Sequence, residues 1–284
     1  MAPFISTHSR HNAIMVTTNT DSNNSEAYKS TQYLLRRITP RGLYYKARTF
    51  SRQYRLLFLP FARWRWTKWR ETYKPALGAA VSQPLSKDSE IVIEGFPRTA
   101  NTFAQVAFEL AQANPVKVAH HTHAAAQVIA GVHQQIPVIL LIRQPEDAIL
   151  SYLIGNFDPD ISMKQVILDY ISFYKPVVPY RDKVVVATFE QLTTDYAAII
   201  RRVNQQFGTD YNVFESTAEN TERCFQVIEE GTRTTFQTVK ESNISRPSDS
   251  RRAYKEMLSE EYHGPALSRY VNKAQAVYDR LVIE

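Results

Sequence analysis

The stretch IVIEGFPRTANTFAQVAFEL, residues 91–110, decides the fold class of this 284-residue chain. Residues 91–96 form a nearly continuous apolar run rich in β-branched side chains, which is typical of a strand covered on both faces of a sheet. A helical pattern of apolar residues begins at residue 101, directly after the short turn at 97–100. A strand that passes through a short turn into a helix is the unit from which parallel α/β sheets are built.

The same alternation continues along the chain. Further strands are predicted at 116–121, 137–143 and 184–189, and helices at 101–113, 123–135, 145–155, 162–175 and 193–208. Pro145 favours the start of one helix, and Gly208 favours the end of another. Residues 217–284 are predicted to be mostly helical, with a polar loop at 242–252. The sequence therefore predicts an α/β fold in which helices flank a parallel β-sheet.

Charge divides the chain into unequal parts. The net charge is +6, yet residues 29–75 carry thirteen bases and one acid, whereas residues 1–28 and 76–284 have net charges of −1 and −5. We predict a flexible tail at 1–28, a basic aromatic extension with its linker at 29–84, and the α/β domain at 85–284.

Composition excludes several classes of protein. A hydrophobic fraction of 44% excludes a wholly disordered chain, and the single Cys224 excludes an intrachain disulfide or a zinc site with several cysteines. The chain has no apolar stretch of membrane-spanning length and no secretory leader pattern. The sequence therefore predicts a soluble, cytoplasmic protein.

The basic extension at 29–75 has a pattern of its own. Pro40 and Pro60 are expected to break it into two or three short amphipathic pieces. Trp64, Trp66 and Trp69 among basic residues suit an amphipathic helix on an anionic membrane surface, which would make the protein peripheral to the membrane. Packing of the apolar side on the domain is an equal alternative, and nucleic acid is disfavoured because no nucleic-acid-binding module is recognisable.

The turn after the first strand is the first candidate site. In a parallel sheet, a strand end followed by a helix N-terminus is where anions bind, because free backbone N–H groups and the helix dipole point there. Arg98 supplies a fixed charge, and Thr102 supplies a hydroxyl donor. The loop is not a Walker A motif, because the pattern and its lysine are absent. An ordinary strand-to-helix turn is the alternative.

The second candidate site follows the third strand. Arg143 emerges at the same edge of the sheet as the first loop, and Ser151 lies eight residues on, about two helical turns away. A guanidinium group and a hydroxyl that converge there could hold a second phosphate. Taken alone, both residues would more often be structural.

Together, the order and spacing of these two motifs resemble the sulfotransferases that use 3′-phosphoadenosine 5′-phosphosulfate (PAPS), over roughly residues 90–205. The segment at 96–103 is similar to their 5′-phosphosulfate loop, and the segment from Arg143 to Ser151 is similar to their 3′-phosphate motif. The resemblance implies the P-loop-like sulfotransferase fold, PAPS as co-substrate and a hydroxyl-bearing acceptor such as a sugar, a lipid or a small alcohol.

The resemblance also implies roles for individual residues. Arg98 matches the family's basic residue that stabilises the leaving phosphate. Arg143 and Ser151 match the ligands of the 3′-phosphate. The donors around the 5′-phosphate are implied to be Thr99, Ala100, Asn101 and Thr102. Ala100 stands where the family has glycine, and Asn101 where it has threonine. In the family a basic loop near the C-terminus covers the 3′-phosphate, which makes Arg251 and Arg252 further candidates.

Histidines follow the second strand. An acceptor hydroxyl has a pKa far above neutrality, so transfer benefits from a base, and imidazole titrates in the useful range. The family's base lies in a Lys-Thr-His context; the similar run His121-Thr122-His123 makes His123 the favoured base and His121 its substitute. A structural histidine is the alternative. A metal site is disfavoured, since no further ligand occurs at a recognisable spacing, and we expect no metal requirement.

The sequence is compatible with two other functions. One is a nucleotide-dependent kinase-like phosphotransferase, which the missing Walker lysine disfavours. The other is a protein that keeps the nucleotide pocket without the chemistry, which the changes at Ala100 and Asn101 leave open.

Overall fold

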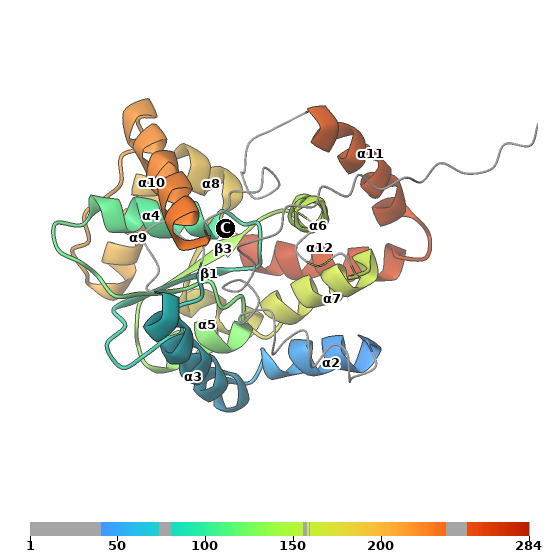
Figure 1. Cartoon of the computed structure of the whole chain (residues 1–284), viewed down its shortest axis with the longest axis horizontal. Helices are drawn as coiled ribbons and strands as arrows, with labels where there is room; N and C mark the ends of the chain where they lie inside the picture. Colours follow the sequence, from blue (N-terminus) through green and yellow to red (C-terminus); the bar gives the residue numbers. More distant parts are fainter. Residues whose placement is uncertain (1–40, 74–80, 156–157, 159, 237–248, 284) are drawn as a thin grey trace, which may run out of the picture. The chain divides into compact units, whose positions relative to one another are not determined.

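The computed structural model describes residues 41–73, 81–155, 158, 160–236 and 249–283, all of them in one compact unit. Its centre is a sheet of four parallel strands in the order β2-β1-β3-β4 (Figure 1). The strands are β1 (Ile91–Gly95), β2 (Val118–His120), β3 (Val138–Ile142) and β4 (Val185–Thr188). The predicted α/β fold with a helix-flanked parallel sheet is confirmed, and each predicted strand is present.

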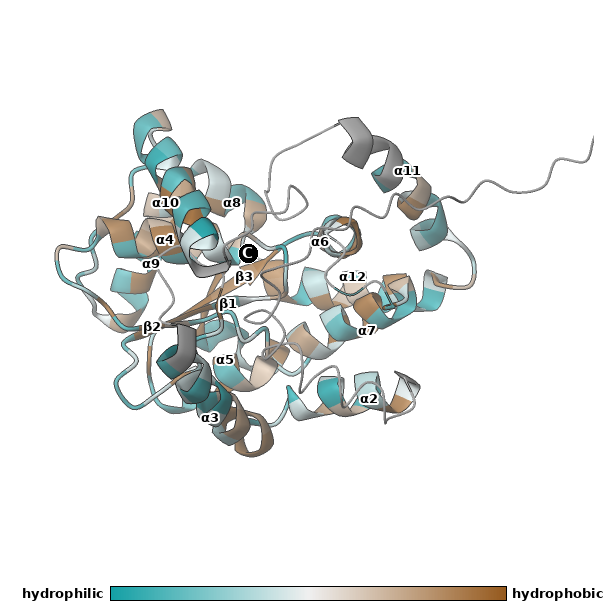
Figure 2. Cartoon of the chain, viewed as in Figure 1, coloured by the Kyte–Doolittle hydropathy of each residue, from teal (hydrophilic) through white to brown (hydrophobic). Residues whose placement is uncertain are grey.

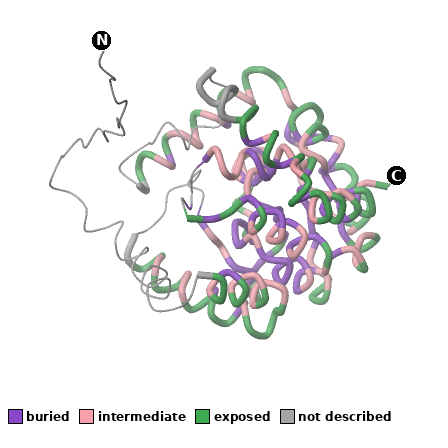
Figure 3. The backbone as a smooth tube through the Cα atoms, turned by 90° about the vertical axis from the view of Figure 1, so that its right-hand side faces the viewer, coloured by how far each residue is buried: buried purple, intermediate pink, exposed green. Residues whose placement is uncertain are grey.

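The strands are apolar because both faces of the sheet are covered. Val92 and Leu140 belong to one hydrophobic core, whereas Ile93 and Ile139, their chain neighbours, belong to the other. One core is completed by α4 (Asn101–Ala111), α9 (Tyr196–Phe207) and α10 (Ala218–Phe236). The other is completed by α5 (Ala125–His133), α6 (Pro145–Ile154), α7 (Met163–Tyr174) and α12 (Ser268–Val282). Hydrophobic residues and buried backbone accordingly gather around the sheet (Figures 2 and 3).

The helix ends follow local chemistry. Pro145 occupies the first turn of α6, and Gly208 closes α9 in the left-handed region at φ 66°. The helix predicted at 193–208 is two helices, because Thr188 caps a separate short α8 (Phe189–Thr194) and Asp195 caps α9. A 3₁₀ turn, η1 (Val178–Lys183), was not predicted.

The basic extension packs on the domain where the structure describes it. Two helices, α2 (Arg41–Ser51) and α3 (Arg55–Tyr73), contact α7 and α5 respectively, and Tyr45 and Leu59 enter the core. The expectation that Pro60 breaks a helix is wrong. Pro60 is the sixth residue of α3, where it removes one hydrogen bond near the helix start, and the chain turns at 52–54 instead.

The C-terminal part is helical, as predicted. After α10, helix α11 (Asp249–His263) contacts α6, and α12 contacts α7. The loop predicted at 242–252 is wrong for residues 249–252, which form the first turn of α11. Residues 242–248 lie outside the described part of the chain.

The order of the strands creates a crevice. From β1 the chain crosses to β2 on one side and then to β3 on the other, so the carboxyl ends of β1 and β3 flank the point where the order reverses, the usual ligand site in such sheets. The backbone of β3 lies so close to the end of β1 that only glycine fits at position 95. A Cβ there would lie 2.6 Å from the carbonyl oxygen of Leu141.

Candidate active site at the carboxyl edge of the sheet

The loop between β1 and α4 is built from strained backbone. Arg98 and Ala100 have φ values of 72° and 62°, in the left-handed region that favours glycine. Thr99 Oγ1 donates a hydrogen bond to the Phe96 carbonyl at 2.8 Å, and Asn101 Nδ2 donates to the same oxygen at 2.9 Å. These two buried side chains therefore brace the loop from inside. No side chain of the described residues caps α4. Its N-terminal N–H groups can therefore donate hydrogen bonds to a ligand on the outer side of the loop.

The second predicted site lies against the first. Arg98 Nε donates to Ser151 Oγ at 3.0 Å, and Arg143 Nη1 donates to the Arg98 carbonyl at 3.3 Å. The structure thus brings together the polar side chains of Arg98, Arg143 and Ser151, whereas Thr99 and Asn101 face the Phe96 carbonyl and Thr102 faces His121. Arg143 also lies over the Phe189 ring at 4.0 Å, a cation–π contact that holds its guanidinium plane.

Arg143 retains unused hydrogen-bonding capacity. Its Nε is buried and has no hydrogen-bond partner among the described residues. Burial lowers the pKa of Arg143, and the charges of Asp147 and Glu190 partly offset this effect. A buried N–H without an acceptor is costly, and an anion in the crevice would satisfy it.

Two tyrosines of α7 support both loops. Tyr174 OH donates to the Leu141 carbonyl at 2.7 Å and accepts from the Phe96 N–H at 3.2 Å. Tyr170 OH donates to the Arg143 carbonyl at 2.8 Å. Both tyrosine side chains are buried and brace the two loops from behind.

The histidines after β2 differ in what their ring nitrogens do. His121 Nε2 lies 3.0 Å from Thr102 Oγ1, and its Nδ1 lies 2.6 Å from His120 Nδ1, so both nitrogens are engaged. Burial lowers the pKa of His121 well below its usual value, and the neighbouring His120 and His123 lower it further. The His121 ring is therefore a neutral, structural part of the loop.

His123 forms a hydrogen bond through Nδ1, and no described residue forms one with its Nε2. Its Nδ1 lies 2.8 Å from the Gly95 carbonyl, which only accepts, so Nδ1 carries the proton and Nε2 carries the lone pair. Burial lowers the pKa of His123 to about 4, the hydrogen bond to Gly95 opposes this, and the charge of Arg52 adds to it. At neutral pH the imidazole is therefore uncharged.

Glu94 is a site residue that the sequence analysis missed. It is fully buried in β1 and accepts hydrogen bonds from the Thr122 N–H at 2.9 Å, the Thr122 hydroxyl at 2.8 Å and the His123 N–H at 3.2 Å. Burial raises its pKa to about 7, while these hydrogen bonds lower it. Glu94 positions the histidine loop; its signal was one acid inside the apolar run 91–96.

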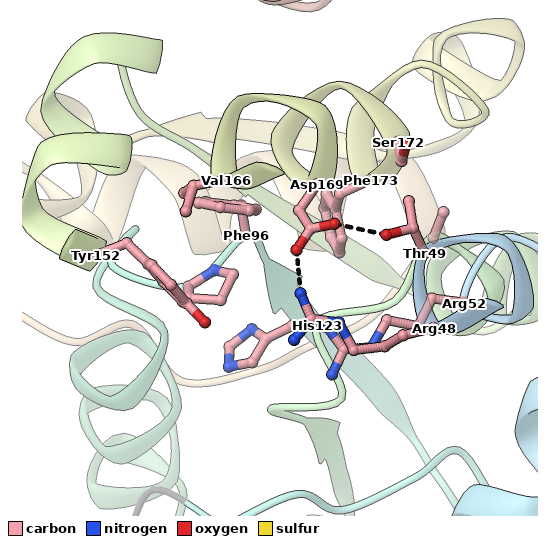
Figure 4. A pocket seen from close by; sticks show the side chains of 12 residues that line it. Arg48, Thr49, Arg52, Phe96, His123, Tyr152, Val166, Asp169, Ser172 and Phe173 are labelled. Carbon is pink, nitrogen blue, oxygen red and sulfur yellow. Dashed lines mark hydrogen bonds and ion pairs between the residues drawn. The ribbon is translucent and has the colours of Figure 1, made fainter. Parts of the chain in front are cut away.

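A pocket opens beside His123. Figure 4 shows side chains of α2 and α7 around it, with Tyr152 of α6 across from Arg48 of α2 and Arg52 of the turn after α2. The pocket is lined by Arg48, Thr49, Arg52, Phe96, Pro97, His123, Ala125, Tyr152, Val166, Asp169, Ser172 and Phe173. The α2 residues were not predicted as site residues, because nothing in the basic run distinguishes those that reach the domain.

Two remaining sequence predictions have different outcomes. The side chains of Arg251 and Arg252 lie outside the described residues, although their backbone belongs to α11. Among the described residues, no cluster of three or more histidine, cysteine, aspartate or glutamate side chains is arranged to hold a metal ion.

Comparison of the chain with protein-family models and with curated proteins gives no match. Among solved structures it is similar to mouse sulfotransferase SULT7A1 complexed with PAP, with a TM-score of 0.36 and 10% sequence identity over 67% of this chain and 90% of that chain. A likeness at this level assigns no function, so the functional argument depends on the chain's own residues.

Proposed function

We propose that this protein is a PAPS-dependent sulfotransferase that moves a sulfuryl group to an acceptor hydroxyl. The observation that carries the proposal is the network of Arg98, Arg143 and Ser151 at the carboxyl ends of β1 and β3, beside the neutral imidazole of His123. Two anion-binding elements and a base at one sheet edge match the needs of a nucleotide with two phosphate positions and of a hydroxyl acceptor.

The residues present fit such a nucleotide. The loop at 97–102, with the uncapped N-terminus of α4 and Arg98, would hold the 5′-phosphosulfate. Arg143 and Ser151 would hold the 3′-phosphate, and the Arg143 Nε, unpartnered among the described residues, is the donor that this phosphate would satisfy. Because the side chains of Thr99 and Asn101 face inward, the loop's contribution would come mainly from backbone N–H groups.

His123 is the proposed base. Its Nε2 takes the proton of the acceptor hydroxyl as the acceptor oxygen forms its bond to sulfur and the bond from sulfur to the phosphate oxygen breaks. Arg98 stabilises the negative charge that develops on the departing phosphate. The pKa of about 4 keeps Nε2 unprotonated at pH 7, and an anion bound nearby raises that pKa toward the range in which imidazole is an effective base.

Two measurements test the proposal. Titration calorimetry is expected to show that 3′-phosphoadenosine 5′-phosphate (PAP) binds and that Arg143→Ala weakens this binding by about 10- to 100-fold, as expected for a lost charge-assisted hydrogen bond. Labelled sulfate is expected to pass from PAPS to a member of a panel of hydroxyl compounds. Arg201→Ala, on the exposed side of α9, is the matched control and should leave PAP affinity unchanged.

Other outcomes identify the alternatives. Tighter binding of magnesium-ATP than of PAP, with phosphate transfer, would replace the proposal by a kinase-like activity. Binding of PAP with no sulfate transfer to any hydroxyl would leave a nucleotide-binding protein without the chemistry.

A further inference from the structure

Helix α2 and the turn that follows it give the pocket two arginines with different surroundings, Arg48 and Arg52. Arg48 forms an ion pair with Asp169, and the same carboxylate accepts a hydrogen bond from Thr49 Oγ1 at 2.6 Å and from Gln165 Nε2 at 2.9 Å. Burial lowers the pKa of Arg48, but Asp169, Tyr152, Tyr44 and Asp158 together more than offset this effect, and the pKa is raised. Arg48 therefore has its counterion within the protein.

Arg52 lacks such a counterion among the described residues. The carboxylate of Asp169 is already shared by three donors, and no hydrogen bond or ion pair joins the Arg52 guanidinium to another described residue. Burial lowers the pKa of Arg52 and the nearby Arg48 lowers it further, whereas Asp169 and Tyr152 offset only part of this effect. A partly buried guanidinium next to other cations is expensive unless an anion is brought to it.

The charge of the pocket points the same way. Among its lining residues, Arg48 and Arg52 carry positive charges and Asp169 carries a negative one, while His123 is neutral at pH 7. The lining is thus one charge positive, and the uncompensated charge is on the side chain beside the proposed base (Figure 4).

We infer that the acceptor hydroxyl belongs to an anionic molecule, and that Arg52 binds its carboxylate, sulfate or phosphate group while the hydroxyl lies at His123. This inference rests on the proposed function for the reaction, but the binding of the anion to Arg52 does not depend on it. A guanidinium fork is suited to such groups, because it donates two parallel hydrogen bonds to their oxygens.

Matched pairs of acceptors test the inference. Suitable pairs are p-hydroxyphenylacetate with p-hydroxyphenylacetamide, and galacturonate with galactose. For at least one pair we expect the anionic member to bind at least 10-fold more tightly in calorimetry, and to have a kcat/KM with PAPS higher by a similar factor. Arg52→Met should bring both ratios close to one, and Arg52→Lys should keep part of the preference. Arg280→Met, an exposed change on α12, should keep the ratios of the wild type.

Several results would overturn the inference. They are equal binding of both members by the wild type, a preference that survives Arg52→Met, or an equal loss for both members in Arg52→Met, which would assign Arg52 to the transferred group. Calorimetry without nucleotide reports on the pocket even if no sulfate is transferred. A failure of the proposed function, seen as no PAP binding and no transfer, is therefore distinguishable from a failure of this inference.

A second inference comes from the outer face of the same helices. Most of the exposed large apolar side chains among the described residues lie on α2, α3 and the turn between them: Leu43, Phe50, Tyr54, Leu56, Leu57, Phe61 and Trp64. Leu56 is 80% exposed, and the N-terminal half of α3 forms a hydrophobic end in Figure 2. Phe50 packs against Tyr54 and Phe61 against Trp64, and soluble surfaces rarely expose such clusters of large apolar side chains.

Basic side chains surround this apolar surface. Lys46, Arg55, Arg63 and Arg70 are exposed on the same two helices, whose 41–73 segment contains one acid, Glu71. Apolar side chains flanked by cations are the pattern that inserts into the headgroup region of an anionic bilayer. No helix in the described ranges is long and apolar enough to span a bilayer, so any contact through these helices is peripheral.

We propose that the apolar surface of α2 and α3 binds an anionic membrane. Flotation of the full chain should recover it with vesicles of phosphatidylcholine containing phosphatidylglycerol, and at least fivefold less with phosphatidylcholine alone. Leu56→Glu should reduce flotation at least fivefold. Met257→Glu, at an exposed apolar side chain of α11, should not.

Equal flotation of the wild type and Leu56→Glu would overturn the membrane proposal. It would also be overturned if the wild type is a dimer in light scattering, does not float, and becomes a monomer in Leu56→Glu, because a second copy of the chain would then cover this surface.

Discussion

The carboxyl edge of the sheet and helix α2 both place arginines around His123, but they hold them differently. At the sheet edge, Arg98 and Arg143 are held by a serine hydroxyl, a backbone carbonyl and an aromatic ring. Arg48 on α2 is held by a carboxylate, whereas Arg52, in the turn after α2, has no such partner among the described residues.

This difference indicates which cations serve the fold and which serve a ligand. A guanidinium with its own carboxylate is already neutralised and attaches one element to another. A guanidinium held only by neutral groups keeps its charge for an incoming anion. By this criterion Arg48 attaches α2 to α7, and we expect Arg52 and Arg143 to serve an anionic ligand.

The largest expected effect comes from removing the proposed base, His123, at the carboxyl edge of the sheet. His123→Gln is expected to lower kcat by about 10²- to 10⁴-fold, the usual contribution of general-base catalysis, and to leave PAP affinity within about twofold. The reason is that the His123 side chain is tied to the nucleotide loop through the Gly95 carbonyl rather than through a phosphate-binding group. Single-turnover kinetics with PAPS and calorimetry with PAP measure the two quantities.

The control for that change is His133→Gln, at an exposed histidine at the end of α5. It should leave both quantities unchanged. A loss of PAP binding in His123→Gln would instead make His123 a structural part of the edge.

The next effect concerns the attachment of α2. Asp169→Asn leaves the partly buried Arg48 without its counterion, and we expect the free energy of unfolding to fall by about 2 kcal/mol. PAP affinity should be kept, since the hydrogen bonds of Asp169 go to α2 and to its own helix. Chemical denaturation measures the first quantity and calorimetry the second.

Asp88→Asn removes an exposed ion pair with Lys117 and is the control, with an expected loss below about 0.5 kcal/mol. Equal effects of the two substitutions would mean that the Arg48–Asp169 pair does not hold α2 to the domain.

Much of the fold and part of the site follow from the sequence, because their signals are local. A strand end is visible as the end of an apolar run, so the sequence is enough to place Arg98 and Arg143 at one edge of the sheet. The eight-residue spacing places Ser151 on the following helix, and the structure adds that its hydroxyl accepts from Arg98. The bounds of α8 and α9 were missed because caps at Thr188 and Asp195 divide one apolar pattern.

The rest depends on contacts between residues far apart in the chain. Arg52 is one of thirteen basic residues in the segment 29–75, and only the packing of α2 on α7, just before it, distinguishes it from the exposed Arg55. Glu94 was overlooked since one acid in an apolar strand has no meaning until the histidine loop is placed above it. Pro60 misled because a proline near a helix start removes only one hydrogen bond.

The smallest expected effect concerns backbone strain in the loop at 97–100. Helix α2 has no such strain, because none of its described residues has a positive φ. Ala100 has φ 62°, so Ala100→Gly relieves a left-handed backbone conformation that costs an alanine about 1–2 kcal/mol, while the greater freedom of glycine in the unfolded chain takes back about half. A net gain of about 0.5–1 kcal/mol should raise the Tm by about 1–4 °C. Ala276→Gly, at an exposed position in the middle of α12, should lower the Tm by a similar amount, because glycine destabilises the interior of a helix. Equal falls in both variants would mean that the loop at 97–100 is not strained.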